Sequence, residues 1–183
     1  MKVAGMKLRL FAALLTVPYL VGGIAFIMLS GSAEGYTTPR AVFLLLLPIG
    51  FIQVLVIAAR SIWKLNQRRP VFSKSAVAAV VSPIAFFLCM VAGFGIDERA
   101  LTETKLRGDD IVKRLEIFTA ETGTCPNDIA SLYPNGTAAP KPALKNANFS
   151  LSVRASNCFV GFPAYTFLYC TKASTDEEWF CYS

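Results

Sequence analysis

Residues 76–123 read AVAAVVSPIAFFLCMVAGFGIDERALTETKLRGDDIVKRLEIFTAETG, and this stretch changes character at residue 97. Its first part, Ala76–Ile96, has 21 residues without a charged side chain, enough for a helix to cross a bilayer core of about 30 Å. Its second part, Asp97–Gly123, is rich in charge, but four apolar residues share one helical face. They are Ile111, Val112, Leu115 and Phe118. The stretch predicts a membrane-spanning helix and then an amphipathic helix, either continuous or hinged at Gly93–Gly95, and Gly123 suits its C-terminal cap.

Two further apolar runs precede this stretch. Leu10–Ala33 has 24 residues without charge and Ala41–Ala59 has 19. The three runs together predict an α-helical membrane bundle of three transmembrane helices, at about residues 10–30, 41–62 and 76–96.

The first run can also be interpreted as a signal peptide. Three basic residues precede it, and Gly31–Ala33 (GSA) would serve as a cleavage site. The basic residues are Lys2, Lys7 and Arg9. The run is longer than the 7–15 residues typical of the apolar part of a signal peptide, so we favour a retained helix.

Basic residues predict the orientation in the membrane. The connection at residues 60–74 has no acidic residue and five basic ones: Arg60, Lys64, Arg68, Arg69 and Lys74. Cytoplasmic loops hold the excess of Lys and Arg, so we expect this loop and the N-terminus inside and residues 97–183 outside. The topology accounts for the net charge of +6, and nucleic-acid binding is not expected. The expected location is a bacterial inner membrane, with the C-terminal domain in the periplasm.

The cysteines support the same orientation. Cys89 lies in the third apolar run, whereas the other four lie in the segment that the charges place outside: Cys125, Cys158, Cys170 and Cys181. An even number of cysteines in a small extracytoplasmic domain predicts disulfides formed in an oxidising compartment.

Residues 97–183 predict a small α+β domain, in which the long helix packs on an antiparallel sheet. Strand-like segments occur at Phe149–Arg154, Tyr165–Thr171 and Glu178–Ser183. A turn centred on Ser174–Asp176 would place Cys170 opposite Cys181, within disulfide reach. Four cysteines allow three pairings; we favour Cys170–Cys181, which leaves Cys125–Cys158.

Several classes of chemistry lack their residues. The chain has no histidine, which excludes nucleophiles activated by histidine. The cysteines form no CxxC pair of the kind that binds zinc. The three apolar runs contain no ionisable side chain apart from Cys89 and tyrosine, which argues against a transporter or pump. We expect a protein that is not an enzyme and that has no cofactor, metal site or small-molecule substrate.

Two sets of residues are candidates for contacts. In the third run, small residues recur every three or four positions and predict a helix-packing face: Ala78, Ser82, Ala85, Cys89 and Gly93. Gln53, the single amide within a run, is expected to bond to a neighbouring helix. Aromatic residues of the outer domain are candidates for an interaction surface, although half or more should be core: Tyr133, Phe162, Tyr165, Trp179 and Tyr182. Asp109 and Asp110 are expected on the polar face of the helix.

The layout and one short segment resemble type IV pilins and pseudopilins. The segment combines an amphipathic helix, a Gly-x-x-Pro turn and a short apolar motif. The matching residues are Leu115, Phe118, Gly123, Pro126, Ile129, Leu132 and Pro134. The resemblance implies a pilin-like domain. Pilins, however, carry their apolar helix at the extreme N-terminus after a cleaved leader, so a fixed anchor is expected here in place of a filament subunit.

We therefore expect an integral membrane protein that presents a pilin-like periplasmic domain to a protein partner, in envelope assembly or secretion. The bilayer and this partner are the expected contacts. Two alternatives are an immunity protein that neutralises a periplasm-acting toxin and an accessory subunit of a membrane complex.

Overall fold

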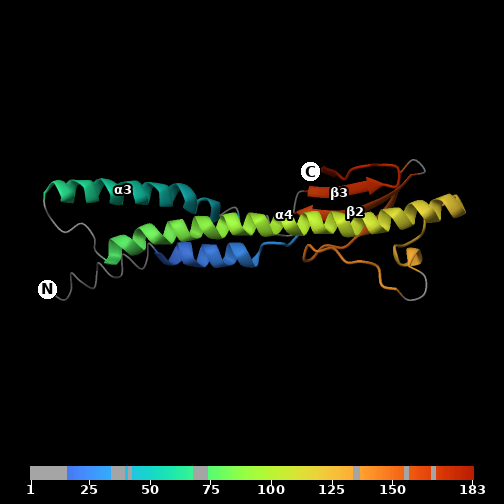
Figure 1. Ribbon diagram of the computed structural model, residues 1–183, viewed down its shortest axis with the longest axis horizontal. Helices are drawn as coiled ribbons and strands as arrows, with labels where there is room; N and C mark the ends of the chain where they lie inside the picture. Colours follow the sequence, from blue (N-terminus) through green and yellow to red (C-terminus); the bar gives the residue numbers. More distant parts are fainter. Residues whose placement is uncertain are drawn as a thin grey trace. The chain divides into compact units, whose positions relative to one another are not determined.

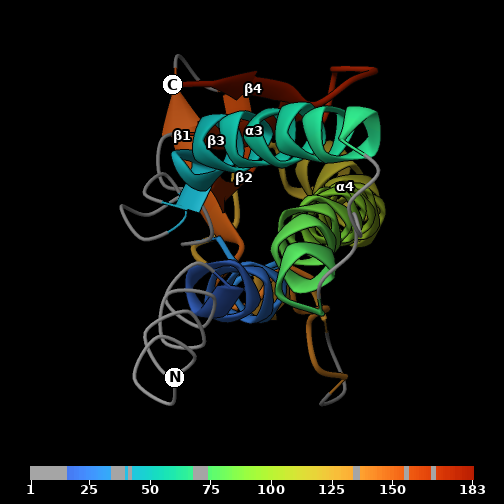
Figure 2. The same cartoon turned by 90° about the vertical axis from the view of Figure 1, so that its left-hand side faces the viewer.

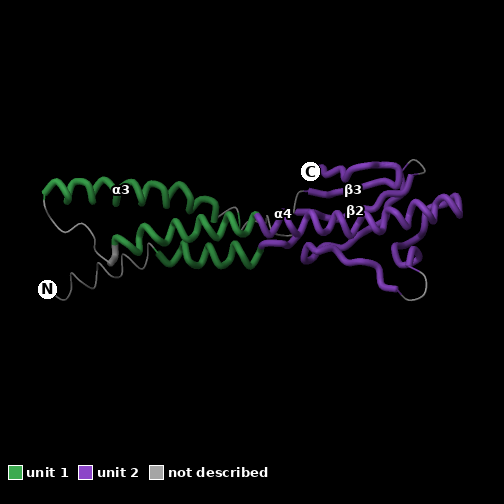
Figure 3. Tube along the Cα trace, viewed as in Figure 1, with its two compact units in different colours: residues 1–29, 38–94 green, residues 30–37, 95–183 purple. Residues whose placement is uncertain are grey.

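The computed structural model describes residues 16–33, 40, 43–67, 74–133, 137–154, 157–165 and 168–183. The chain divides into two compact units, coloured separately in Figure 3. A helical unit comprises Met1–Leu29 and Thr38–Phe94, and an α+β unit comprises Ser30–Thr37 and Gly95–Ser183. Residues 10–15 of the first predicted span, residues 68–73 of the basic loop and Pro134 lie outside the described residues.

Helix α4 (Lys74–Thr122) is the element that the opening stretch predicts. It is one continuous helix of 49 residues (Figure 1), so the chain is not broken at Gly93–Gly95. The helix ends where predicted: Gly123 has φ +69°, and its N–H donates to the Thr119 carbonyl at 2.9 Å.

The prediction of three transmembrane helices is wrong. Two helices of the described chain are long and apolar enough to cross a bilayer: α3 (Leu46–Asn66) and the apolar part of α4. The first apolar run instead contains a helix, Thr16–Met28, that is shorter than 18 residues. It ends because Gly31 takes φ +72° and the next residues bond to the α+β unit, with the Gly31 N–H donating to Asp97 Oδ1 at 2.6 Å.

Small residues let the Thr16–Met28 helix approach α4 closely. A Cβ atom at Gly23 would lie 3.2 Å from Cys89 Sγ, so these two residues are in direct contact. Of the predicted packing face, Ser82 and Gly93 are buried, Ala85 and Cys89 are half-buried, and Ala78 is exposed. The buried stripe of α4 also includes Ala79 and two larger residues, Phe86 and Met90.

Gln53 bonds to a neighbouring helix, as predicted. Pro83 lies inside α4 and has no N–H, so it leaves the carbonyl of Ala79, four residues earlier, without its usual helical donor. Gln53 Nε2 of α3 donates to this carbonyl at 2.7 Å. Gly50 permits the approach, since a Cβ there would lie 2.9 Å from Pro83 Cβ.

The α+β unit contains a four-stranded antiparallel sheet in the order β1-β2-β3-β4 (Figures 1 and 2). Its strands are β1 (Ser150–Arg154), β2 (Asn157–Tyr165), β3 (Leu168–Ala173) and β4 (Phe180–Tyr182). A short 3-10 helix, η1 (Ala130–Leu132), precedes them. The predicted α+β arrangement therefore fits, whereas the membrane part differs from the prediction.

The core of this unit lies between α4 and one face of the sheet. Two clusters form it, one around Ile111, Leu115 and Val160 and the other around Phe162 and Leu144. The predicted apolar face of the helix is thus the face that packs on the sheet.

Both predicted disulfides are confirmed. Cys125 is bonded to Cys158 and Cys170 to Cys181. Cys170 and Cys181 are direct cross-strand neighbours in β3 and β4, as the predicted turn requires.

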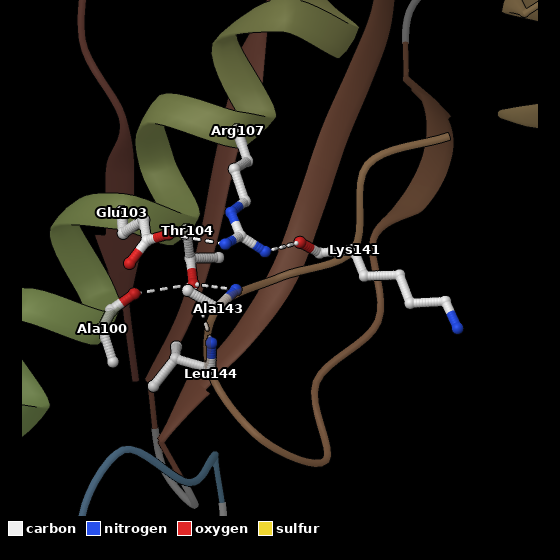
Figure 4. Close-up of polar contacts among 7 residues, drawn as sticks. All are labelled: Ala100, Glu103, Thr104, Arg107, Lys141, Ala143 and Leu144. Carbon is white, nitrogen blue, oxygen red and sulfur yellow. Dashed lines mark hydrogen bonds and ion pairs between the residues drawn. The ribbon is translucent and has the colours of Figure 1, made fainter. Parts of the chain in front are cut away.

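The loop at residues 137–149 is attached to α4 by a buried threonine (Figure 4). Thr104 is fully buried, and its Oγ1 accepts hydrogen bonds from the amides of Ala143 and Leu144, each at 3.0 Å. The same hydroxyl donates to the Ala100 carbonyl at 2.7 Å. Arg107 Nη1 donates to the Lys141 carbonyl at 2.9 Å, so one turn of α4 holds the loop.

Candidate binding face of the sheet

The strand register divides the sheet residues between two faces. Residues directly opposite each other in an antiparallel pair share a face. Phe162, Cys170 and Cys181 are aligned across β2, β3 and β4, and all three belong to the core beneath the sheet. Their neighbours along each strand must therefore lie on the opposite face.

Two neighbouring rows of this opposite face include the aromatic residues of β3 and β4, and we call these two rows the outer face. The register aligns Ser150, Gly161, Thr171 and Phe180 in the first row. It aligns Pro163, Tyr169 and Tyr182 in the second. The aromatic rings of these rows thus come from β3 and β4, whereas β1 and β2 contribute Ser150, Gly161 and Pro163.

The aromatic residues of β4 are the most exposed members of the outer face. Phe180 is 75% exposed and Tyr182 is 40% exposed. Tyr169 is half-buried, and its ring centroid lies 6.1 Å from that of Tyr182. The three rings form an exposed aromatic cluster on the side of the sheet away from the core.

Gly161 allows the Tyr169 ring to lie against the sheet. A Cβ atom at residue 161 would lie 2.7 Å from Tyr169 Oη and 2.8 Å from its Cε1, so any side chain there would displace the ring. Ser150 Oγ donates to the Gly161 carbonyl at 3.3 Å and lies 2.6 Å from Tyr169 Oη. Either hydroxyl can donate in the Ser150–Tyr169 hydrogen bond.

The two rows carry no acidic or basic side chain; on the same side of the sheet, Arg154 lies at the end of β1, next to the turn into β2. Lys172 follows Thr171 but lies on the core side, where its Nζ is 3.0 Å from Asp109 Oδ1. The outer face is therefore suited to an uncharged contact in which tyrosine rings supply apolar area and their hydroxyls supply hydrogen bonds.

The five predicted surface aromatics do not form one surface. Tyr133 and Phe162 are 6% and 0% exposed, so their assignment to a surface is corrected: both lie in the core because they project toward α4. Tyr165 is half-buried and its hydroxyl donates to the Asp97 carbonyl at 3.1 Å. Trp179 packs on Phe162, with ring centroids 5.2 Å apart. Of the five, only Tyr182 belongs to the outer face.

Sequence reasoning missed Phe180 and Tyr169. The signal was present in the predicted hairpin: if Cys170 and Cys181 face the core, the residues beside them on each strand face outward. That alternation assigns Tyr169, Phe180 and Tyr182 to one surface.

Asp109 does not lie on a merely solvated face of α4. Its Oδ1 accepts hydrogen bonds from Lys172 Nζ at 3.0 Å and Trp179 Nε1 at 2.9 Å. The indole lies directly over Gly108, where a Cβ would be 2.5 Å from the ring. Asp109 therefore ties the segment before β4 to α4.

Asp110 attaches the turn after α4 in the same way. It accepts a hydrogen bond from the Tyr133 hydroxyl at 2.8 Å, and Arg114, which is 3.3 Å from the same oxygen, stacks over the Tyr133 ring. Burial, together with the hydrogen bond to Asp110 and its charge, raises the pKa of Tyr133 well above its ordinary value. Asp110 is exposed on α4, as expected for the polar face of the helix, and in addition bonds to Tyr133; Asp109 is half-buried and bonds to Lys172 and Trp179.

The α+β unit also has a small concavity. A hollow of about 230 Å³ beside the end of α4 is lined by Arg114, Ile117, Phe118, Glu121, Ser131 and Leu132. In the ranges that the structure describes, no group of three or more His, Cys, Asp or Glu side chains is arranged to hold a metal ion.

Comparison with protein-family models, with curated proteins and with solved structures gave no match to this chain. Its function must be inferred from its own residues.

Proposed function

We propose that this protein is a membrane-anchored, non-enzymatic binding protein that presents its pilin-like α+β unit in the periplasm to a protein partner. The two long apolar helices and the two disulfides fit a membrane-anchored protein with an extracytoplasmic domain. The outer face of the sheet is the proposed binding surface.

The orientation follows from the charges and the disulfides. With α3 and α4 as the crossings, Arg60 and Lys64 in the last turns of α3 favour a cytoplasmic connection between them. The α+β unit is then outside, where its disulfides form. The predicted cytoplasmic N-terminus depended on the first predicted span, and it is not part of this proposal.

The observation that carries the proposal is the exposure of the aromatic cluster formed by Tyr169, Phe180 and Tyr182. The core on the other face of the sheet is complete without these rings. Contiguous exposed apolar surface on a small domain commonly marks an interaction site, and tyrosine and phenylalanine are enriched in protein interfaces.

The size of the outer face predicts a weak contact. Four strands about 4.8 Å apart give a face roughly 20 Å across, on the order of 400 Å². Stable complexes bury about 800 Å² per partner. Binding through this face therefore benefits from a partner held in the same membrane or cell wall, where the effective concentration is high.

The test is crosslinking in intact cells followed by purification from membranes and identification of the crosslinked partner. Wild type is compared with a Phe180→Ser/Tyr182→Ser double variant and with Ile117→Ser, a matched control that removes an apolar side chain 59% exposed on α4. We expect one envelope-assembly or secretion component with wild type and the control, and at least a fivefold loss with the double variant.

Other outcomes contradict the proposal in specific ways. Equal recovery of the crosslinked partner with the double variant would show that the outer face is not the binding surface. Recovery of a toxin would favour the immunity function, and a stoichiometric complex that depends on α3 would favour an accessory subunit.

A further inference from the structure

The aromatic cluster depends on the strand that the sheet holds least firmly. β4 contains three residues, and among the described strands it has one neighbour, β3. It contributes Phe180 and Tyr182, the two most exposed rings of the outer face. Only three residue pairs join this edge strand to β3, so its backbone pairing contributes little to holding it in register.

Cys181 is the residue that attaches β4 to the core. Phe180 and Tyr182 both project from the outer face, whereas Cys181 packs in the core cluster that contains Phe162. It is disulfide-bonded to Cys170, which is fully buried in β3. The bond lies at the middle one of the three residue pairs that join β3 to β4.

Within β4, the disulfide is supplemented by the backbone pairing with β3 and by the contact between the Tyr169 and Tyr182 rings; the polar side-chain attachments of this segment lie before the strand. Trp179 bonds to Asp109, and Lys172 Nζ donates to the Glu177 carbonyl at 2.9 Å. These contacts fix the turn between β3 and β4. They do not hold Phe180 and Tyr182 beside Thr171 and Tyr169.

We propose that the Cys170–Cys181 disulfide is a redox clasp that assembles the binding face. This inference rests on the proposed function of the outer face. With the disulfide closed, β4 pairs with β3 and the aromatic cluster is complete. With the disulfide open, β4 separates from β3 and the face loses two of its three rings.

The reaction is ordinary thiol–disulfide exchange with a dithiol reductant. A thiolate of the reductant attacks Sγ of Cys181, the more exposed sulfur, and the S–S bond breaks. Cys170 leaves as a thiolate and takes up a proton. The second thiol of the reductant then releases Cys181, so two cysteine thiols and one oxidised dithiol result. A disulfide oxidant reverses the reaction.

The second disulfide provides a matched control. Cys125–Cys158 joins the turn after α4 to the start of β2 and makes no bond to β4. Opening it should loosen the turn and leave the aromatic cluster in place.

The test is hydrogen–deuterium exchange of the full chain in detergent. Cys181→Ser opens the clasp while the buried Cys170 stays in place, and Cys125→Ser opens the control disulfide. We expect exchange in Phe180–Tyr182 to rise at least tenfold in Cys181→Ser, with little change in β1 and β2. In Cys125→Ser it should stay within twofold of wild type.

Wild type treated with a dithiol reductant provides a second measurement that introduces no substitution. Because the reductant opens both disulfides, it should show the loss of protection at β4 seen in Cys181→Ser together with the loosened turn of Cys125→Ser, and both should be reversed on reoxidation. Unchanged protection of β4 in both Cys181→Ser and the reduced protein would overturn the clasp, as would equal loss across the whole sheet.

Crosslinking distinguishes this failure from failure of the proposed function. If the clasp is correct, Cys181→Ser loses the partner to the same extent as Phe180→Ser/Tyr182→Ser. If oxidised wild type captures no partner, the proposed function fails, whereas the exchange measurement still decides whether the disulfide holds β4.

Discussion

The outer face depends on a single residue without a side chain. Gly161 leaves the space in which the Tyr169 ring lies, with a would-be Cβ 2.7 Å from the phenolic oxygen. Because that oxygen is also bonded to Ser150, a displaced ring loses a hydrogen bond as well as its packing.

We expect Gly161→Ala to lower the free energy of unfolding by about 1–3 kcal/mol, since it overpacks the site. Urea unfolding followed by near-UV circular dichroism of the tyrosines measures this. Gly95→Ala is the control, because nothing lies within 4 Å of a Cβ there; alanine should stabilise the helix by up to about 1 kcal/mol. An unchanged free energy of unfolding in Gly161→Ala would show that the Tyr169 ring can move aside without cost.

Tyr133 makes stability depend on pH in the alkaline range. Burial and Asp110 raise the pKa of Tyr133 in the folded state, whereas the unfolded phenol ionises near pH 10. The contribution of the protonated Tyr133 phenol to the free energy of unfolding is therefore fully present below pH 10. It declines as the pH rises above 10, because the phenol loses its proton at a lower pH in the unfolded state than in the folded state.

We expect the urea midpoint of wild type to fall more steeply above pH 10 than that of Tyr133→Phe. Comparison of the two proteins cancels the contribution of the other tyrosines. Parallel midpoint curves would show that Tyr133 ionises equally in both states.

Among the elements, α3 and α4 are joined by a hydrogen bond that compensates for a proline. Gln53 donates to the Ala79 carbonyl that Pro83 leaves without a helical donor. In an apolar environment an unpaired carbonyl is costly, and measured interhelical bonds of this kind contribute about 0.6–1.7 kcal/mol.

We expect Gln53→Leu to destabilise the protein in detergent by about 1 kcal/mol, measured as a shift in thermal unfolding. The same substitution should have little effect in a Pro83→Ala background, because the new backbone N–H of the substituted residue then donates to the Ala79 carbonyl. A double-mutant cycle isolates this coupling, and additive effects would contradict it.

The sequence predicted α4 and both disulfides because the signals are local. Charge separates the two parts of the helix, and the spacing of Cys170 and Cys181 fits a hairpin. The apolar run before Ala33 was misjudged because composition carries no information about Asp97, whose carboxylate bonds to Gly31 only in the folded chain. Tyr133 and Phe162 failed as surface residues for a related reason, because an aromatic residue suits core and interface equally. Strand register places Phe162 in the core, and the hydrogen bond to Asp110 on α4 holds Tyr133 there.

At the scale of the whole molecule, the α+β unit is built from two separated parts of the chain. Ala33 N–H donates to the Lys145 carbonyl at 2.9 Å, and Lys145 N–H donates to the Gly31 carbonyl at 2.8 Å. Asp97, 3% exposed, holds the same segment through the Gly31 amide.

We expect Asp97→Ala to loosen this segment and so raise hydrogen exchange at the distant amide of Lys145 by about tenfold, since a typical buried hydrogen bond contributes about 0.5–1.5 kcal/mol. Glu98→Ala, at the exposed neighbouring position, is the control and should leave exchange unchanged. Retained protection at Lys145 in Asp97→Ala would show that the backbone bonds suffice.

The bonds of Ser30–Ala33 also bear on how this fold can be inherited and engineered. The segment Ser30–Ala33 completes the α+β unit from more than sixty residues upstream. The unit therefore cannot be duplicated, fused or exchanged as one contiguous piece of sequence. Recombination that separates Gly31 from Asp97 would yield an incomplete α+β unit. We therefore expect the segment between these two residues to be inherited together with that unit. A chimera that grafts the domain onto a foreign anchor must supply both pieces, for instance by circular permutation that places Ser30–Ala33 beside its partners.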